Sequence, residues 1–341
     1  MKKIIKSNNF KFIDLFAGIG GMRIAFEKAG GECVFSSDND KFCQITYKHF
    51  FKDDIYGDIT LKETKKLIPE GFNILLAGFP CQPFSSIGKR QGFRHATQGT
   101  LFHDIIEILK THQPEAILLE NVAGLINHDK GDTYKIIKEN LDKLSNTTGY
   151  WIIDKVINAS EYGVPQHRKR IYIVGFRKDL VKAKNPESAF QELNFSFDNI
   201  KKERIKFINP HLEKGVNDRP ITTHLQNVYI SKKDDGRPQI LLHDGSQISN
   251  TLVASYHKIQ RLTGIFVKDG PTGLRLLTEN ECRAIMGYPK ISKKFPKVPV
   301  SRTQMYRQFG NSVAVPVVEK IAREMYKTLK NINSLNEQFN I

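Results

Sequence analysis

The chain has 341 residues, 40% of them hydrophobic, and its 52 Lys and Arg against 36 Asp and Glu give a formal net charge of +16. Four cysteines without a CxxC pair exclude a disulfide scaffold and a zinc ribbon, so no metal is expected, and no apolar run is long enough to span a bilayer. The charge favours a polyanionic partner, most simply a nucleic acid, over the alternative of a lysine-rich surface with no such partner.

Short apolar runs alternate with helix-like segments through the first half of the chain. The expected strands are residues 10–16, 33–37, 73–77, 116–119, 151–156 and 171–176, and the expected helices are residues 21–29, 41–50, 101–110 and 132–144. This alternation predicts the α/β class, with a doubly wound, mostly parallel sheet.

The regular alternation stops after about residue 178, where Lys, Asn, Asp and Gly become frequent. Short β-like pieces there predict a second, smaller, irregular and β-rich domain, and a charged segment could be a solvated helix or strand face. The β-like pieces are residues 228–230, 239–242 and 264–267, the charged segment is residues 200–207, and helices are expected at residues 278–286 and 314–330. The polar tail after about residue 331 is expected to fray.

A glycine turn follows the first expected strand, between Asp14 and Gly21. Glycines at such a turn let the backbone approach a ligand closely, although a tight turn without a ligand is the alternative. Arg23 occupies the third glycine position of the dinucleotide fingerprint, which disfavours NAD. Asp38 lies where an acidic side chain accepts ribose hydroxyls, and Asp58 lies where one could meet a base amine. These features fit S-adenosylmethionine, a nucleoside cofactor without a pyrophosphate.

Cys81 follows the apolar run 73–77 and is flanked by Pro80 and Pro83. Open α/β folds place their chemistry at the carboxyl ends of the strands, and the prolines restrict the backbone around the thiol. Taken alone, this cysteine is as consistent with a small core residue as with a nucleophile.

Six segments resemble, in the same order, the motifs of the bacterial DNA (cytosine-5) methyltransferases. They are residues 14–21, 78–85, 120–122, 166–172, 275–289 and 308–313, and the resemblance covers nearly the whole chain. It implies a Rossmann-like methyltransferase fold. It also implies an S-adenosylmethionine-binding catalytic domain, residues 1–177 plus 300–341, and a target-recognition domain that binds DNA, residues 178–299.

The resemblance also implies a reaction, the transfer of a methyl group from S-adenosylmethionine to C5 of a specific cytosine in double-stranded DNA. Cys81 would attack C6 of a base flipped out of the helix, and Glu120 would hold and protonate N3. Arg168 and Arg170 would stabilise the pocket and contact the base or a phosphate. Without this context, Glu120 is equally consistent with a capping partner and the arginines with a solvated loop.

The resemblance extends the list of candidate site residues. The implied cofactor contacts are Phe16, Gly18, Ile19, Gly20, Gly21, Asp38, Asn39, Asp58, Ile59, Pro80, Leu101, Asn311 and Ser312. The implied DNA contacts are Ser85, Lys89, Arg90, Arg94, Thr251, Tyr256, Lys258 and Arg261, some of which a polar surface loop explains nearly as well. The chain departs from the family pattern at Asp38, where a glutamate is usual, at Asn39, and at Gln98.

Two other functions share parts of this pattern. A tRNA cytosine-5 methyltransferase has the same catalytic motifs, and a non-catalytic relative would retain DNA binding only. The long variable region disfavours the first, and the intact Cys81 and Glu120 disfavour the second. The expected setting is the cytoplasm of a bacterium or phage host, with the protein a monomer off the membrane, functionally paired with a restriction endonuclease.

Overall fold

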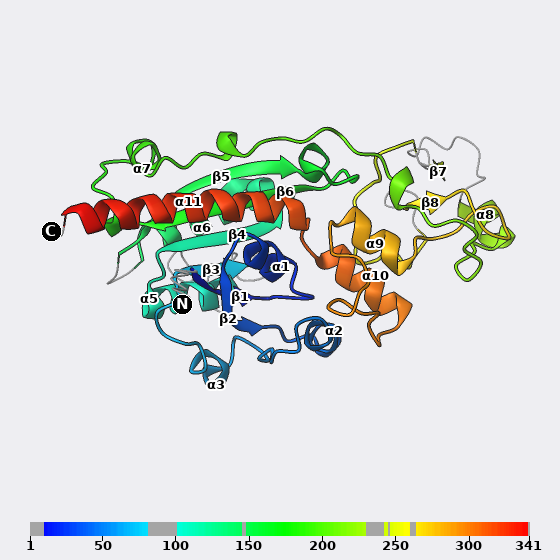
Figure 1. Ribbon diagram of the computed structural model, residues 1–341, viewed down its shortest axis with the longest axis horizontal. Coiled ribbons are helices and arrows are strands. Elements are labelled where there is room, and N and C mark those ends of the chain that lie inside the picture. Colours follow the sequence, from blue (N-terminus) through cyan, green and yellow to red (C-terminus); the bar gives the residue numbers. More distant parts are fainter. Residues whose placement is uncertain are drawn as a thin grey trace, which may run out of the picture.

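A six-stranded sheet forms the centre of the computed structural model, which describes residues 10–80, 101–144, 148–229, 242–244, 246–259 and 264–339 (Figure 1). The strand order is β2-β1-β3-β4-β6-β5. The strands are β1 (Lys11–Leu15), β2 (Glu32–Ser37), β3 (Ile74–Ala77), β4 (Ala116–Val122), β5 (Tyr150–Asn158) and β6 (Lys169–Arg177). Strands β1 to β4 are parallel, and β6 runs antiparallel to both of its neighbours. The predicted α/β class is confirmed.

The central strands are apolar throughout because helices cover both faces of the sheet. In β3, Ile74 and Leu76 pack into the core on one face, and Leu75 and Ala77 pack into the core on the other. All four side chains are fully buried. Such continuous apolar runs are what made the strands recognisable in the sequence.

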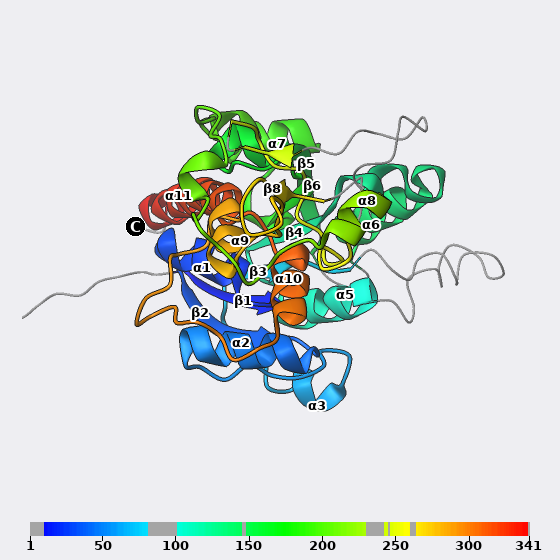
Figure 2. The same ribbon diagram turned by 90° about the vertical axis from the view of Figure 1, so that its right-hand side faces the viewer.

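Helices α1 and α11 lie on one face of the sheet, and α5 and α6 lie on the other (Figure 2). The helices of this part of the chain are α1 (Gly21–Lys28), α2 (Lys41–Phe51), α3 (Lys62–Lys65), α5 (Leu101–His112), α6 (Asp132–Asp142), α7 (Pro186–Glu192) and α11 (Val315–Phe339). The three layers leave the carboxyl ends of β1 and β3 open at one edge, where a ligand can enter.

The last helix returns to the first. The ring of Tyr326 on α11 stacks on Phe10 with 5.3 Å between centroids, and Arg323 donates to the carbonyl of Lys28 at 3.0 Å. Because α11 continues to Phe339, the expected fraying after about residue 331 is wrong. Its apolar face packs on α1 and the sheet as far as Ile332.

The region after β6 is irregular, as expected. Its described elements are α8 (Thr223–Tyr229), β7 (Leu242–His243), β8 (Phe266–Val267), α9 (Glu279–Ile285) and α10 (Arg302–Asn311). Within the described residues its strands are therefore the two-residue β7 and β8. Val228 and Tyr229 belong to a helix, not to the expected strand, and residues 201–207 are exposed without regular structure.

The domain boundaries stay a prediction. Phe190 and Phe195, which follow the proposed boundary at residue 177, pack on Phe176 of β6 and so extend the core of the sheet. Among the described residues, every helix is too short or too polar to cross a membrane.

Candidate active site

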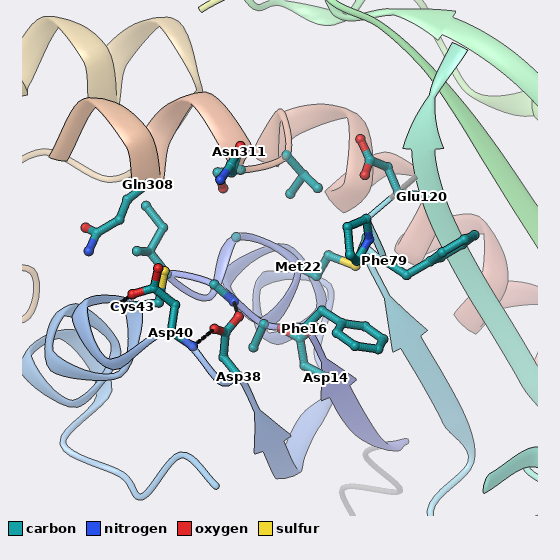
Figure 3. A pocket seen from close by; sticks show the side chains of 18 of the residues that line it. Asp14, Phe16, Met22, Asp38, Asp40, Cys43, Phe79, Glu120, Gln308 and Asn311 are labelled. Carbon is teal, nitrogen blue, oxygen red and sulfur yellow. Dashed lines mark hydrogen bonds between the residues drawn. The ribbon is translucent and has the colours of Figure 1, made fainter. Parts of the chain in front are cut away.

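A cavity of about 600 Å³ opens at the carboxyl edge of the sheet (Figure 3). It lies at the ends of the adjacent strands β1 and β3, from which the chain continues to β2 on one side and to β4 on the other. Open α/β sheets bind ligands at such a switch point. The predicted cofactor residues that line it are Phe16, Gly18, Ile19, Gly21, Asp38, Asn39, Asp58, Ile59, Pro80, Leu101, Asn311 and Ser312. Segments almost 300 residues apart in the chain thus meet around one cavity.

Asp38 ties the glycine turn to the end of β2. Its carboxylate accepts the backbone N–H of Gly18 at 2.8 Å and that of Asp40 at 2.8 Å. Burial raises the pKa of Asp38, and these two hydrogen bonds oppose the shift. Because a carboxylate has about four acceptor positions, Asp38 can still accept ligand hydroxyls.

Gly20 is the one predicted cofactor residue that is not among those lining the cavity, so its contact with a cofactor stays a prediction. It precedes α1 with a φ of 77°, and a Cβ there would overlap the ring of Phe51 and lie 3.2 Å from Tyr47. Gly20 therefore allows α1 to pack against α2. A Cβ at Gly18, by contrast, would meet no atom within 4 Å.

Asp14, at the end of β1, supplies a buried acidic group to the cavity. Its side chain is 1% exposed, and its Oδ2 has no hydrogen-bond partner among the described residues. Burial raises the pKa of Asp14 to about 7, although the backbone N–H and the charge of Arg23 lower it. An unpartnered buried carboxyl oxygen of this kind favours a cationic ligand.

Glu120 and Arg170 form an ion pair at the other side of the cavity. Arg170 Nε lies 3.1 Å from Glu120 Oε1, and both side chains line the cavity. Glu120 is opposite Tyr172 in the antiparallel β4–β6 pair, which puts Arg170 at the diagonal position on the same face. Burial raises the pKa of Glu120, and the charges of Arg170 and then Arg168 oppose that shift. The carboxyl group can therefore take up a proton more readily than an exposed glutamate.

Asn121 links this pair to the segment before Cys81. Its buried amide donates to the carbonyl of Phe79 at 2.9 Å. The sequence placed Asn121 in a motif beside Glu120 without giving it a role, and the structure makes it the anchor of the chain that enters the cysteine segment. Other expected site residues lie outside the described residues: Cys81, Ser85, Lys89, Arg90, Arg94, Gln98 and Arg261.

The sequence model of the family described as C-5 cytosine-specific DNA methylase matches residues 10–327. The chain belongs to this family of enzymes. Type II methyltransferase M.MspI of Moraxella sp is 50% identical over 340 residues, which cover 99% of this chain and 76% of the relative. Type II methyltransferase M.HpaII of Haemophilus parainfluenzae is 41% identical over 347 residues, which cover 95% of this chain and 91% of the relative.

The same fold occurs in the crystal structure of S. pombe Dnmt2 methyltransferase. That structure aligns with a TM-score of 0.70 at 20% sequence identity, over 94% of this chain and 99% of the other. The predicted Rossmann-like methyltransferase fold is confirmed, and so is the family inferred from the six motifs.

Arg168 of this methylase does not line the cavity, which corrects its expected contact with the base or a phosphate. The side chain is 1% exposed, and its guanidinium donates to the backbone carbonyls of Leu252, Gly310 and Ser312. Because both terminal nitrogens are buried and engaged by backbone carbonyls, the group cannot reach a base or a phosphate. Arg170 alone of the two arginines lines the cavity.

Tyr256 is also corrected, because it is a core residue and not a DNA contact. It is 2% exposed, its hydroxyl donates to the carbonyl of Ile265 at 2.6 Å, and the same hydroxyl accepts the N–H of Leu277 at 2.9 Å. Thr251 is partly buried and donates to the carbonyl of His167, whereas Lys258 is exposed. Contacts of these last two with DNA stay predictions.

Cys43, Arg307 and Gln308 are among the residues of the methylase cavity that sequence reasoning did not name as site residues. Gln308 joins α10 to α2, because it accepts the hydroxyl of Thr46 and donates to the carbonyl of Phe42, each at 2.9 Å. Its place in the last of the six motifs was the available signal.

Proposed function

We propose that this methylase transfers a methyl group from S-adenosylmethionine to C5 of a specific cytosine in double-stranded DNA, as the modification enzyme of a restriction-modification system. Membership of the family and the type II methyltransferases among its relatives support this. The observation that carries the proposal is Glu120, a buried carboxyl with a raised pKa held by Arg170 at the rim of a nucleoside-sized cavity.

The cavity residues fit S-adenosylmethionine. Asp14 offers its unpartnered oxygen to a cation, Asp38 and Asp58 offer acceptors to hydroxyl and amine groups, and Phe16 and Ile59 offer apolar surface. Bound S-adenosylmethionine supplies an electrophilic methyl group on a positively charged sulfur. The acidic lining explains why a cationic nucleoside suits this site better than the anionic pyrophosphate of a dinucleotide.

The chain's own residues would prepare the base. The thiolate of Cys81 forms a bond to C6 of cytosine and opens the C5–C6 double bond. Glu120 donates its proton to N3 as negative charge moves into the ring, and C5 becomes nucleophilic enough to accept the methyl group. Loss of the C5 proton to water then restores the C5–C6 double bond and expels Cys81 as a thiolate, and N3 returns its proton to Glu120. A base within the stack is out of reach of these groups, so the target cytosine must flip out.

Bisulfite sequencing of DNA from cells that express the protein tests the proposal. We expect protection of cytosine at one short sequence, together with transfer of labelled methyl groups to duplex DNA in vitro. Labelling of tRNA instead of DNA would show that the substrate is RNA and would reject DNA as the substrate. Labelling of neither would reject the methyl-transfer function altogether.

The substitution Glu120→Gln tests the role of the acid. It keeps the shape of the side chain but removes its proton-donating capacity, so we expect methyl transfer to fall by about 10²- to 10⁴-fold. Binding of S-adenosylhomocysteine, measured by calorimetry, should change little. Glu139→Gln on the exposed face of α6 is the matched control. Full activity in the Glu120 variant would contradict acid catalysis by this residue.

A further inference from the structure

Arg168 joins two regions that serve different ligands in the proposed reaction. One terminal nitrogen donates to the carbonyl of Leu252 at 2.9 Å, within the recognition segment, residues 250–254. The other donates to the carbonyl of Gly310 at 3.0 Å and to that of Ser312. A single rigid group therefore spans from the recognition segment to the end of α10.

The recognition segment is held closely against α10 by other contacts as well. The N–H of Leu252 donates to the side chain of Gln166 at 2.9 Å, so both backbone polar groups of Leu252 are fixed by the segment that precedes β6. A Cβ at Gly310 would overlap the backbone of Val253 and Ala254. Because these atoms are already in contact, a displacement of the segment must be transmitted to Gly310.

The end of α10 is a wall of the cofactor cavity. Gly310, Asn311 and Ser312 line the cavity, and Asn311 points toward it from α10 (Figure 3). The Ser312 hydroxyl also contacts the hydroxyl of Tyr288. Two of the three carbonyls that Arg168 binds, those of Gly310 and Ser312, thus belong to the residues on either side of Asn311.

The guanidinium depends on these carbonyls because it carries a buried charge. Burial, followed by the charge of Arg170, lowers the pKa of Arg168 to about 9, so the group stays protonated at neutral pH. Its Nε has no partner among the described residues. Loss of any of the three carbonyls would leave more of a buried cation unpartnered, which is costly.

We propose that Arg168 is a positioning residue that couples the recognition segment to the cofactor cavity, so that DNA bound at the segment increases the affinity of the cavity for the cofactor. This inference rests on the proposed function, since it takes DNA as the ligand of the recognition segment. The coupling is reciprocal, so bound cofactor increases the affinity for DNA by the same factor.

The shape of the arginine side chain is essential to this role. A planar guanidinium fixes the directions of its donors, so the carbonyls of Leu252, Gly310 and Ser312 keep a set geometry relative to one another. A lysine retains the charge on a flexible stem and cannot hold three carbonyls in that arrangement. Arg168→Lys therefore separates the coupling from the charge.

Calorimetric titration with S-adenosylhomocysteine tests the coupling, with and without saturating duplex DNA. The duplex is an oligonucleotide containing the sequence found by bisulfite sequencing or, where no methylated sequence is found, fragmented genomic DNA of mixed sequence. For the wild-type protein we expect DNA to tighten binding by about 5- to 150-fold. In Arg168→Lys this ratio should fall toward one. A residue that only supports the fold would weaken binding equally in both titrations and leave the ratio unchanged.

Arg283→Lys is the matched control. Arg283 is as buried as Arg168 at 1% exposure, but its guanidinium donates to the carbonyl of Phe295, away from the recognition segment. This variant should keep the wild-type ratio even if its thermal stability falls. Two results would overturn the inference. In one, Arg168→Lys keeps the wild-type ratio of cofactor affinities with and without DNA. In the other, Arg283→Lys lowers that ratio as much as Arg168→Lys does.

Hydrogen exchange of the wild-type protein provides a second test that needs no variant. Duplex DNA added without cofactor should slow exchange in peptides covering residues 308–313, and unchanged exchange would overturn the coupling. Methyl transfer is measured separately. If cytosine is methylated but DNA leaves cofactor affinity unchanged, the coupling alone fails. If the ratio behaves as expected but no methyl group is transferred, the proposed reaction alone fails.

Discussion

Asp14 shows how one carboxyl group can serve binding at the expense of stability. It is buried with one unpartnered oxygen, and its pKa of about 7 lies well above the ordinary 3.8. The groups that act on it electrostatically come from several elements: Arg23 on α1, Cys33 on β2, Asp38 after β2, Tyr47 on α2 and Tyr288 after α9. Of these, only Arg23 is a cation, and its charge does not offset the burial.

The pKa of Asp14 gives a pH dependence of known sign. The folded protein holds this proton more tightly than the unfolded chain, so the ionised group destabilises the ligand-free fold above pH 7, and the penalty fades as the pH falls toward 4. Asp14→Asn should therefore stabilise the ligand-free protein at pH 8 by up to about 4 kcal/mol, with a smaller gain at pH 5.

Urea unfolding at pH 5 and pH 8 measures this difference, and Asp54→Asn, whose side chain is 84% exposed, is the control. The Asp14 variant should also bind S-adenosylmethionine more weakly, since it lacks the charge for a cationic ligand. A stability difference that does not change with pH would show that Asp14 is already neutral or already compensated.

At the scale of the element, the start of α1 is fitted closely to the C-terminal segment. A Cβ at Gly21 would lie 2.5 Å from the Tyr288 hydroxyl and 2.9 Å from Ser312 Oγ. Gly21→Ala should therefore cost about 1–3 kcal/mol of unfolding free energy and weaken binding of S-adenosylhomocysteine. Gly57→Ala, where a Cβ would meet no atom within 4 Å, is the control. Equal stability of both variants by urea unfolding would contradict this close fit.

The elements also mark what sequence alone could predict. Buried strands such as β3 were evident because an apolar run of that length needs cover on both faces. The helical state of Val228 was not evident from the sequence. A short apolar segment is compatible with either a helix or a strand, and the contacts with neighbouring segments determine which of the two forms. In the site, the motifs brought out Glu120, but the burial of Arg168 depends on contacts with residues 84 to 144 positions away, which no local pattern records.

At the scale of the whole molecule, α11 packs against α1 and covers the same face of the central sheet. Ile321 is fully buried in the core that α1 and α11 share. Ile321→Ala should cost about 2–5 kcal/mol of unfolding free energy through the cavity it leaves. Lys327→Ala on the same helix, with 54% of the side chain exposed, should cost little. Thermal and urea unfolding check both, and an Ile321 cost below 1 kcal/mol would mean that α11 is not integral to the fold.

The meeting of Gly21 with Ser312 and Val313 also has a consequence for biosynthesis. One wall of the cofactor cavity is translated almost 300 residues before the opposite wall. Since domains tend to fold as they emerge from the ribosome, the first strands can form long before the cavity exists. A nascent chain that has not reached Val313 therefore lacks a complete site for the methyl donor, and modification of DNA must await synthesis of that segment.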